Sequence, residues 1–201
     1  AVQKQSLQEL IRQRGALPLG QALTIVRALS HILSEAHQAG RFYGGFQPAE
    51  VLLGPGHKVL LGQPAPRLPP YLAPEEMAGG ETGPWTDVYA VGVLAYELLA
   101  GRPPFSGSAE EVARQVAQGA PPIRSFRPGL PEGVQAVLQK ALAWEPQARY
   151  THAVSFSRAL ERALVSQPAQ PAPGPEPPPP QARQRKRLGL AVGLGAAALF
   201  L

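Results

Sequence analysis

The sequence contains no cysteine and only one methionine among its 201 residues. Without thiols it can form neither a disulfide framework nor a thiolate metal site, and this composition fits a reducing compartment. Aromatic residues make up 6% of the chain and are not interleaved with a basic surface, so we expect no stacking platform for nucleic acid. The four histidines (His31, His37, His57 and His152) are scattered, and we expect structural roles for them rather than a metal site.

Charged residues are also scarce, at 16%, and the basic excess lies at one end of the chain. The net charge is +5, but residues 1–165 contain 15 basic and 13 acidic groups, a balance of only +2. Four basic residues at 183–187 precede residues 188–201, an uncharged run of 14 residues. This order is typical of the cytoplasmic flank of a membrane helix. The alternative is a C-terminal helix that packs on the domain.

A membrane span needs about 20 apolar residues, so we predict that residues 188–201 are a truncated transmembrane helix. The protein would then be a single-pass membrane protein with a cytoplasmic domain. Eight of the 24 prolines fall within residues 166–182, which cannot bury enough apolar surface to fold. The predicted organisation is one domain at 1–165, a Pro-rich and then basic juxtamembrane linker at 166–187, and the membrane segment.

Residues 1–165 predict a mainly α domain with one small β-hairpin. Capping boxes begin at Ser6 and Ser108, Pro18 precedes a long apolar stripe that ends at Gly40, and Gly101 is placed to cap a buried helix. The predicted helices span about residues 6–14, 18–39, 87–100, 108–118, 134–142 and 151–165, the last one capped by Thr151. Two short strands, 51–53 and 58–61, form the hairpin. Residues 62–72 contain four prolines and predict a loop without regular structure.

The stretch from Tyr71 to Phe105 contains two landmarks at a kinase-like separation. Ala73-Pro74-Glu75 is similar to the end of a kinase activation segment, and Asp87-Val88-Tyr89 opens an apolar helix similar to the one that follows it. Three further phrases, at 36–40, 97–105 and 141–150, occur in the same order. Together they resemble the C-terminal lobe of a bacterial receptor-type Ser/Thr protein kinase over residues 6–164.

The resemblance implies structural roles for three charged residues. Glu75 would pair with Arg149 and tie the activation segment to the helical core. Asp87 would hydrogen-bond the backbone of the catalytic loop. Loss of one partner of such a buried pair costs about 3 to 5 kcal/mol, so folding alone explains why both residues are present.

The catalytic loop departs from the family's His-Arg-Asp-Leu-Lys-Pro-x-Asn pattern. With Pro48 aligned to the motif's proline, Gly45 stands at the catalytic Asp, Gln47 at the Lys and Glu50 at the metal-binding Asn. Gly62 stands where the Asp of the metal-binding Asp-Phe-Gly motif is expected. We therefore predict no catalytic residues and no metal site, and we expect Glu50 to be a solvated surface carboxylate.

The Gly-rich loop and the strand Lys of the family's N-terminal lobe would lie before Ala1, so we expect that lobe to be absent from this chain. Phosphoryl transfer requires metal ions, a base and a cation on the transferred group. With those groups missing, the expected cofactor is none. ATP and magnesium would be needed only if the protein were an active enzyme.

These observations favour a catalytically inactive, kinase-like module that is tethered to a membrane and signals by binding proteins. The predicted partner surface contains Trp85, Phe105 and the helix 109–118; the alternative is that Phe105 belongs to the core and Trp85 is a partly exposed loop residue. A different class of function is an active Ser/Thr kinase whose N-terminal lobe lies outside this chain. A third possibility is a gene remnant without an independent function.

Overall fold

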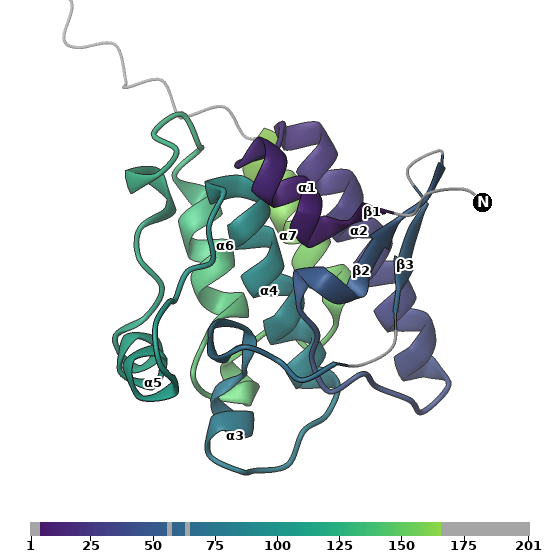
Figure 1. Cartoon of the computed structure of the whole chain (residues 1–201), viewed down its shortest axis with the longest axis vertical. Helices are drawn as coiled ribbons and strands as arrows, with labels where there is room; N and C mark the ends of the chain where they lie inside the picture. The colour runs from purple at the N-terminus through teal and green to yellow at the C-terminus, as the bar shows by residue number, and fades with distance from the viewer. Residues whose placement is uncertain (1–4, 56–57, 63–64, 166–201) are drawn as a thin grey trace, which may run out of the picture. The chain divides into compact units, whose positions relative to one another are not determined.

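Seven α-helices and three short strands form the part of the chain that the computed structural model describes, residues 5–55, 58–62 and 65–165 (Figure 1). The helices are α1 (Leu7–Arg14), α2 (Leu19–Gln38), α3 (Pro74–Met77), α4 (Pro84–Ala100), α5 (Ala109–Gln118), α6 (Gly133–Ala141) and α7 (Ala153–Val165). The strands are β1 (Gln5–Ser6), β2 (Val51–Leu53) and β3 (Val59–Leu61). The predicted mainly α architecture is confirmed.

These residues belong to one compact unit, Ala1–Pro168. The predicted linker at 166–187 and the predicted membrane segment at 188–201 lie outside the described residues. Within the described ranges, no helix is both long enough and apolar enough to cross a membrane.

Both predicted capping boxes are present. At the start of α1 the Ser6 hydroxyl accepts a hydrogen bond from the Glu9 N–H at 3.3 Å, and the Glu9 carboxylate accepts one from the Ser6 N–H at 3.1 Å. Ser108 and Glu111 make the same two bonds at the start of α5, at 3.3 and 2.7 Å. Each box satisfies N–H groups that have no partner within the helix, and so it fixes where the helix begins.

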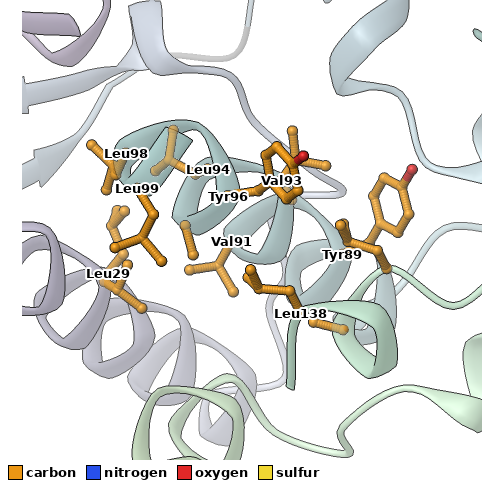
Figure 2. Packing of buried hydrophobic residues seen from close by; sticks show 14 of the residues in the cluster. Leu29, Tyr89, Val91, Val93, Leu94, Tyr96, Leu98, Leu99 and Leu138 are labelled. Carbon is orange, nitrogen blue, oxygen red and sulfur yellow. The ribbon is translucent and has the colours of Figure 1, made fainter. Parts of the chain in front are cut away.

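Helix α4 is the centre of the core, and every residue from Thr86 to Leu99 is buried. It packs against α2, α6 and α7. Figure 2 shows Leu29 of α2 and Leu138 of α6 reaching α4 from different sides. A helix that is apolar on all faces must be covered on all faces, which explains this central position. Asp87, in the first turn of α4, and Glu97, near its end, are therefore held in fixed positions by the packing of this helix.

Gly101 ends α4 in the left-handed conformation, with φ at 77°, and its N–H donates to the Glu97 carbonyl at 2.7 Å. A Cβ atom at this position would lie 2.6 Å from the backbone nitrogen of Ala16. Both the dihedral angle and the close approach of the α1–α2 connection therefore require glycine.

The predicted hairpin is present as β2 and β3, in which Val51 lies opposite Leu61 and Leu53 opposite Val59. The structure adds a third strand, because Gln5 and Ser6 pair antiparallel with the end of β2. Two residues are too few to produce an alternating pattern, so no periodicity indicated β1. The sheet has the order β1-β2-β3 and lies beside α1 and α2 (Figure 1).

Two predicted helix starts and one predicted loop differ from the structure. Helix α4 begins at Pro84 rather than at Asp87, because proline is well suited to the first turn of a helix. A short 3-10 helix, Pro69–Tyr71, interrupts the loop predicted to be irregular, since consecutive prolines fix φ near a helical value. Helix α7 begins at Ala153, and the His152 carbonyl accepts its first hydrogen bonds, so Thr151 stands one residue before the cap.

Candidate functional site

Three of the four positions aligned to catalytic residues, Gly45, Gln47 and Glu50, lie in the segment between α2 and β2, residues 41–50, which we call the 41–50 loop. The fourth, Gly62, follows β3. Asp87, in the first turn of α4, is fully buried directly beneath the 41–50 loop. Its carboxylate accepts hydrogen bonds from the backbone N–H groups of Tyr43 at 3.0 Å and Gly45 at 2.8 Å. The imidazole Nε2 of His37 lies 2.8 Å from the same carboxylate. Asp87 therefore holds the loop by its backbone.

Gly45 stands beside an ion pair instead of presenting a side chain. The pair is formed by Arg67 and Glu76, which come from the segment that follows β3 and from α3. A Cβ atom on Gly45 would lie 3.0 Å from the Arg67 guanidinium and 3.2 Å from a Glu76 carboxylate oxygen. A side chain at residue 45 would thus begin in tight contact with two charged groups.

Glu76 is largely buried in this position. Burial raises its pKa above the ordinary value, although the Ala73 N–H, at 2.9 Å, and the Arg67 guanidinium both act to lower it. Desolvation therefore outweighs the pairing at this carboxylate. The contact between Arg67 and Glu76 joins the residues after β3 to α3, and both lie against the 41–50 loop.

Gln47 joins the 41–50 loop to residues 66–68, which follow β3. Gln47 is only 7% exposed. The amide nitrogen donates to the Pro66 carbonyl at 3.2 Å, and the amide oxygen accepts from the Leu68 N–H at 3.1 Å. One side chain therefore satisfies two backbone groups that belong to no helix or strand.

Glu50 is 6% exposed, so the prediction of a solvated carboxylate was wrong. One carboxylate oxygen accepts from the Ala65 N–H at 2.7 Å, and the other accepts from the Gln47 N–H at 2.9 Å. The Gly62 N–H donates to the Glu50 carbonyl at 2.7 Å, and a Cβ on Gly62 would lie 3.1 Å from that oxygen. Glu50 is buried because it joins the loop to the residues after β3.

These contacts do not fit a divalent cation. Magnesium requires oxygen ligands that face the ion, whereas each Glu50 oxygen faces an N–H donor and Gly62 supplies no carboxylate. Across residues 5–55, 58–62 and 65–165, no group of three His, Asp or Glu side chains is arranged to hold a metal ion. The chemistry available in the loop is hydrogen bonding between chain segments.

The structure brings Glu75 and Arg149 together in a nearly buried pair. Arg149 donates to the two carboxylate oxygens at 2.8 and 2.7 Å, and it also donates to the carbonyls of Ala143, Trp85 and Trp144. Burial acts to raise the pKa of Glu75, but the hydrogen bonds and charge of Arg149, together with a backbone hydrogen bond and the Thr86 hydroxyl, outweigh burial and lower this pKa. Arg149 thus joins α3, α4 and the connection between α6 and α7.

The two aromatic residues predicted to form a partner surface are placed differently. Trp85 is half-buried in the first turn of α4. Phe105 is 1% exposed and belongs to the core cluster, so its predicted contact with a partner was wrong. Helix α5 buries Val112 and Val116 and exposes a mainly polar face. Only Trp85 of the predicted pair is accessible.

Sequence reasoning missed a buried contact between Tyr71 and Glu97. The Tyr71 hydroxyl donates to one Glu97 carboxylate oxygen at 3.1 Å, and the other oxygen has no hydrogen-bond partner among the described residues. Burial raises the pKa of Glu97 to about 7, and the hydrogen bond from Tyr71 opposes this rise only in part. Neither this contact nor the pair of Arg67 and Glu76 follows a helix or strand period, so no local pattern indicated them.

Comparisons with known proteins show that the chain is similar to protein kinases. A family model described as the protein kinase domain matches residues 67–163. The serine/threonine-protein kinase PknL of Mycobacterium tuberculosis H37Rv is 30% identical over 189 residues, which cover 83% of this chain and 46% of PknL. PknB of Mycobacterium leprae is 29% identical over 82% of this chain and 30% of that kinase. The chain thus spans less than half the length of these relatives.

Solved structures show the same similarity. The PknI kinase domain of M. tuberculosis matches with a TM-score of 0.65 and 30% identity, over 81% of this chain and 63% of that domain. A double mutant of the same domain matches with a TM-score of 0.68 and 29% identity, over 82% of this chain and 63% of that one. The helical, kinase-like fold expected from the sequence is therefore confirmed.

Proposed function

This chain belongs to the protein kinase-like superfamily, and we propose that it is a catalytically inactive member that acts by binding other proteins. In active members a carboxylate in the loop accepts or orients the hydroxyl proton, and metal ions neutralise the phosphates. Here the corresponding positions are Gly45, Glu50 and Gly62. Their contacts support a structural role for the loop.

The observation that carries the proposal is the ion pair beside Gly45. A carboxylate side chain at residue 45 would begin within 3.2 Å of both Arg67 and Glu76. The position of the base is therefore bordered by groups that belong to a different segment of the chain. The carboxylate among them, that of Glu76, is engaged by Arg67 and by the Ala73 N–H, which supports a structural role for it.

The other substituted positions support the same proposal. Gln47 and Glu50 together accept three backbone N–H bonds and donate one, all of which join the 41–50 loop to itself or to residues 65–68. The loop and the segment that covers it form a closed hydrogen-bonded unit. Such a unit suits a scaffold with one fixed conformation better than a site that must admit a substrate.

The location and the partners are part of the proposal as well. The basic cluster at 183–187 and the apolar run that follows it support attachment to a membrane through a Pro-rich linker, with the kinase-like domain in the cytoplasm. The nearly neutral charge of residues 1–165 supports a protein partner rather than nucleic acid. Deletion of residues 183–201 is expected to move the full-length protein from the membrane fraction to the soluble fraction.

The decisive experiment is a phosphoryl-transfer assay on the full-length protein with magnesium, labelled ATP and a general protein substrate. We expect no label in the substrate or in the protein itself, while an active bacterial Ser/Thr kinase labels the same substrate in a parallel reaction. Magnesium-dependent transfer that disappears in Glu50→Gln would contradict the proposal. That result would favour instead an active Ser/Thr kinase that uses ATP and magnesium.

A further inference from the structure

A half-open groove with a volume of about 630 Å³ lies beside Trp85. We call it the Trp85 groove. Its apolar walls come from Pro84 and Trp85 at the start of α4 and from Pro146 and Tyr150 in the connection between α6 and α7. A second pocket of about 630 Å³ adjoins it and shares His37 and His152 as lining residues. Both pockets are half-open to solvent rather than closed cavities.

The walls of the Trp85 groove are fixed by the buried contacts that hold the fold together. Arg149 donates to the Trp85 carbonyl at 3.1 Å while both of its terminal nitrogens bind Glu75. The ring of Tyr150 is placed between Lys140, whose ammonium lies 4.7 Å from the ring centroid, and Phe156, whose centroid lies 5.7 Å away. A preformed groove of this kind requires little ordering when a ligand binds.

Three residues that line the Trp85 groove have groups that can donate hydrogen bonds to a ligand. They are Trp85 with its indole N–H, Gln147 with its amide N–H and Thr151 with its hydroxyl. Arg149 offers little to a ligand, because its guanidinium is occupied by Glu75 and three carbonyls. A ligand with carbonyl acceptors and few N–H groups is therefore complementary to these walls.

A proline-rich peptide has this chemistry. Proline has no backbone N–H, its carbonyls are free in the polyproline II helix, and its flat ring packs against aromatic side chains. Peptides of this kind dock into aromatic-lined grooves whose side chains donate to the peptide carbonyls. Glu81 lies at the edge of the Trp85 groove with an exposed side chain and supplies a negative charge for a basic residue that flanks the prolines.

We propose that the Trp85 groove binds a proline-rich peptide segment of a partner protein, with a basic residue of that segment beside Glu81. This inference rests on the proposed binding function and names the chemistry of the partner. It assigns Trp85 as the central contact, Gln147 and Thr151 as donors to the peptide backbone, and Glu81 as the group that sets the orientation of the peptide.

The test is fluorescence anisotropy of a labelled synthetic peptide that contains repeated prolines followed by arginine, titrated with the full chain. We expect saturable binding, and we expect a control peptide with alanine in place of each proline to bind at least about tenfold more weakly. Trp85→Ala should weaken binding about tenfold or more. Trp144→Ala is the matched control, because Trp144 is 44% exposed and lies outside the Trp85 groove, and it should leave affinity within about twofold.

Two further variants keep the test decisive if Trp85→Ala fails to fold. Gln147 is exposed, so Gln147→Ala should retain the native circular dichroism spectrum and still weaken binding about threefold or more. Glu81→Gln should weaken binding of the arginine peptide but not of the same peptide without arginine. No saturable binding at about 1 mM peptide, or equal losses in Trp85→Ala and Trp144→Ala, would overturn the assignment of the groove. The phosphoryl-transfer assay is independent of this result, so the two proposals can fail separately.

Discussion

Glu97 is a buried acid with few hydrogen-bond partners. It lies near the end of α4 and is 6% exposed, and only one of its carboxylate oxygens has a partner among the described residues, the Tyr71 hydroxyl. Burial raises its pKa from the 4.5 of an ordinary glutamate to about 7. The folded protein therefore binds a proton at Glu97 more tightly than the unfolded chain does.

This shift predicts that Glu97 makes stability depend on pH. Since its pKa is raised on folding, its contribution is fully present below pH 4.5 and is lost as the pH rises through about 7. Glu97→Gln keeps an uncharged acceptor for Tyr71 and cannot lose a proton. We expect the variant to gain roughly 2 to 3 kcal/mol relative to wild type between pH 5 and pH 8, measured by urea unfolding.

Tyr71→Phe is the companion variant. It removes the hydrogen bond from Tyr71 to Glu97, and we expect it to cost about 1 kcal/mol and to strengthen the dependence on pH. Glu75 acts in the opposite direction, because its pKa is lowered and its contribution is lost as the pH falls below about 4.5. The comparison must therefore stay above pH 5. Parallel stability curves for wild type and Glu97→Gln would contradict the assigned role.

Gly45 provides a second prediction at this scale. Its φ is 95°, so any side chain is strained there, and a Cβ would also press on the pair of Arg67 and Glu76. Gly79 has a φ of 68°, and a Cβ added there would meet nothing within 4 Å, so Gly79→Ala measures the cost of the dihedral angle alone. We expect that cost to be about 1 to 2 kcal/mol and Gly45→Ala to cost about 1 kcal/mol more, by chemical denaturation.

The excess cost of Gly45→Ala has a specific cause that a double mutant can isolate. Arg67 cannot move away from the new methyl group without weakening its contact with Glu76. In an Arg67→Ala background we therefore expect Gly45→Ala to cost about 1 kcal/mol less than in wild type, while the cost of Gly79→Ala does not change. An unchanged cost of Gly45→Ala in that background would place the strain elsewhere in the 41–50 loop.

At the scale of elements, the sequence predicted those features that repeat or that have a local chemical signature. The apolar stripe of α2, the two capping boxes and Gly101 all follow from spacing and backbone chemistry. The 3-10 helix Pro69–Tyr71 and strand β1 were missed, because three and two residues contain no full period. Short elements depend on tertiary neighbours, and a single sequence does not contain that information.

In the candidate site too, local features were predictable from the sequence and tertiary contacts were not. The alignment to Pro48 placed Gly45, Gln47 and Glu50 in one stretch, and in the structure this stretch is the 41–50 loop that Asp87 holds. The burial of Glu50 could not be foreseen, because its partners Gln47 and Ala65 come from two separate segments that meet only in the fold. A carboxylate becomes buried when enough backbone N–H groups converge on it, and that convergence is a property of the folded chain.

The junction between α4 and the α1–α2 connection gives a prediction at the element scale. Gly101 and Gly40 both follow helices and have φ values of 77° and 69°, but only a Cβ on Gly101 would meet backbone atoms, at 2.6 Å from the Ala16 nitrogen. Gly40→Ala should cost about 1 to 2 kcal/mol, which is the strain of the dihedral angle, and Gly101→Ala should cost about 2 kcal/mol more. Thermal unfolding of the two variants measures the difference, and equal midpoints would contradict it.

At the scale of the whole described unit, the buried polar contacts converge on one face of α4. Asp87 holds the 41–50 loop, Thr86 donates to Glu75 at 2.8 Å, and Glu97 accepts from Tyr71. Each contact joins the central helix to a segment that has little regular structure of its own. These contacts therefore hold the less regular segments in fixed positions around α4.

This arrangement predicts unequal local stability, which native-state hydrogen exchange can measure. Helix α4 is buried along its length, so its amides from Val91 to Leu99 should exchange only when the whole unit unfolds. Helix α5 makes its main contacts with α3 and with the 3-10 helix Pro69–Tyr71, and it lies at the periphery in Figure 1. Its amides should exchange through local opening, with a free energy at least about 2 kcal/mol below the global value.

The amides of α2 serve as the internal control, because α2 packs against both α4 and α7 and should be nearly as protected as α4. The expected order of protection is therefore α4, then α2, then α5. If α5 exchanged as slowly as α4, its two buried valines, Val112 and Val116, would have to anchor it as firmly as the whole core anchors α4. That result would contradict the view that the unit is organised around one central helix.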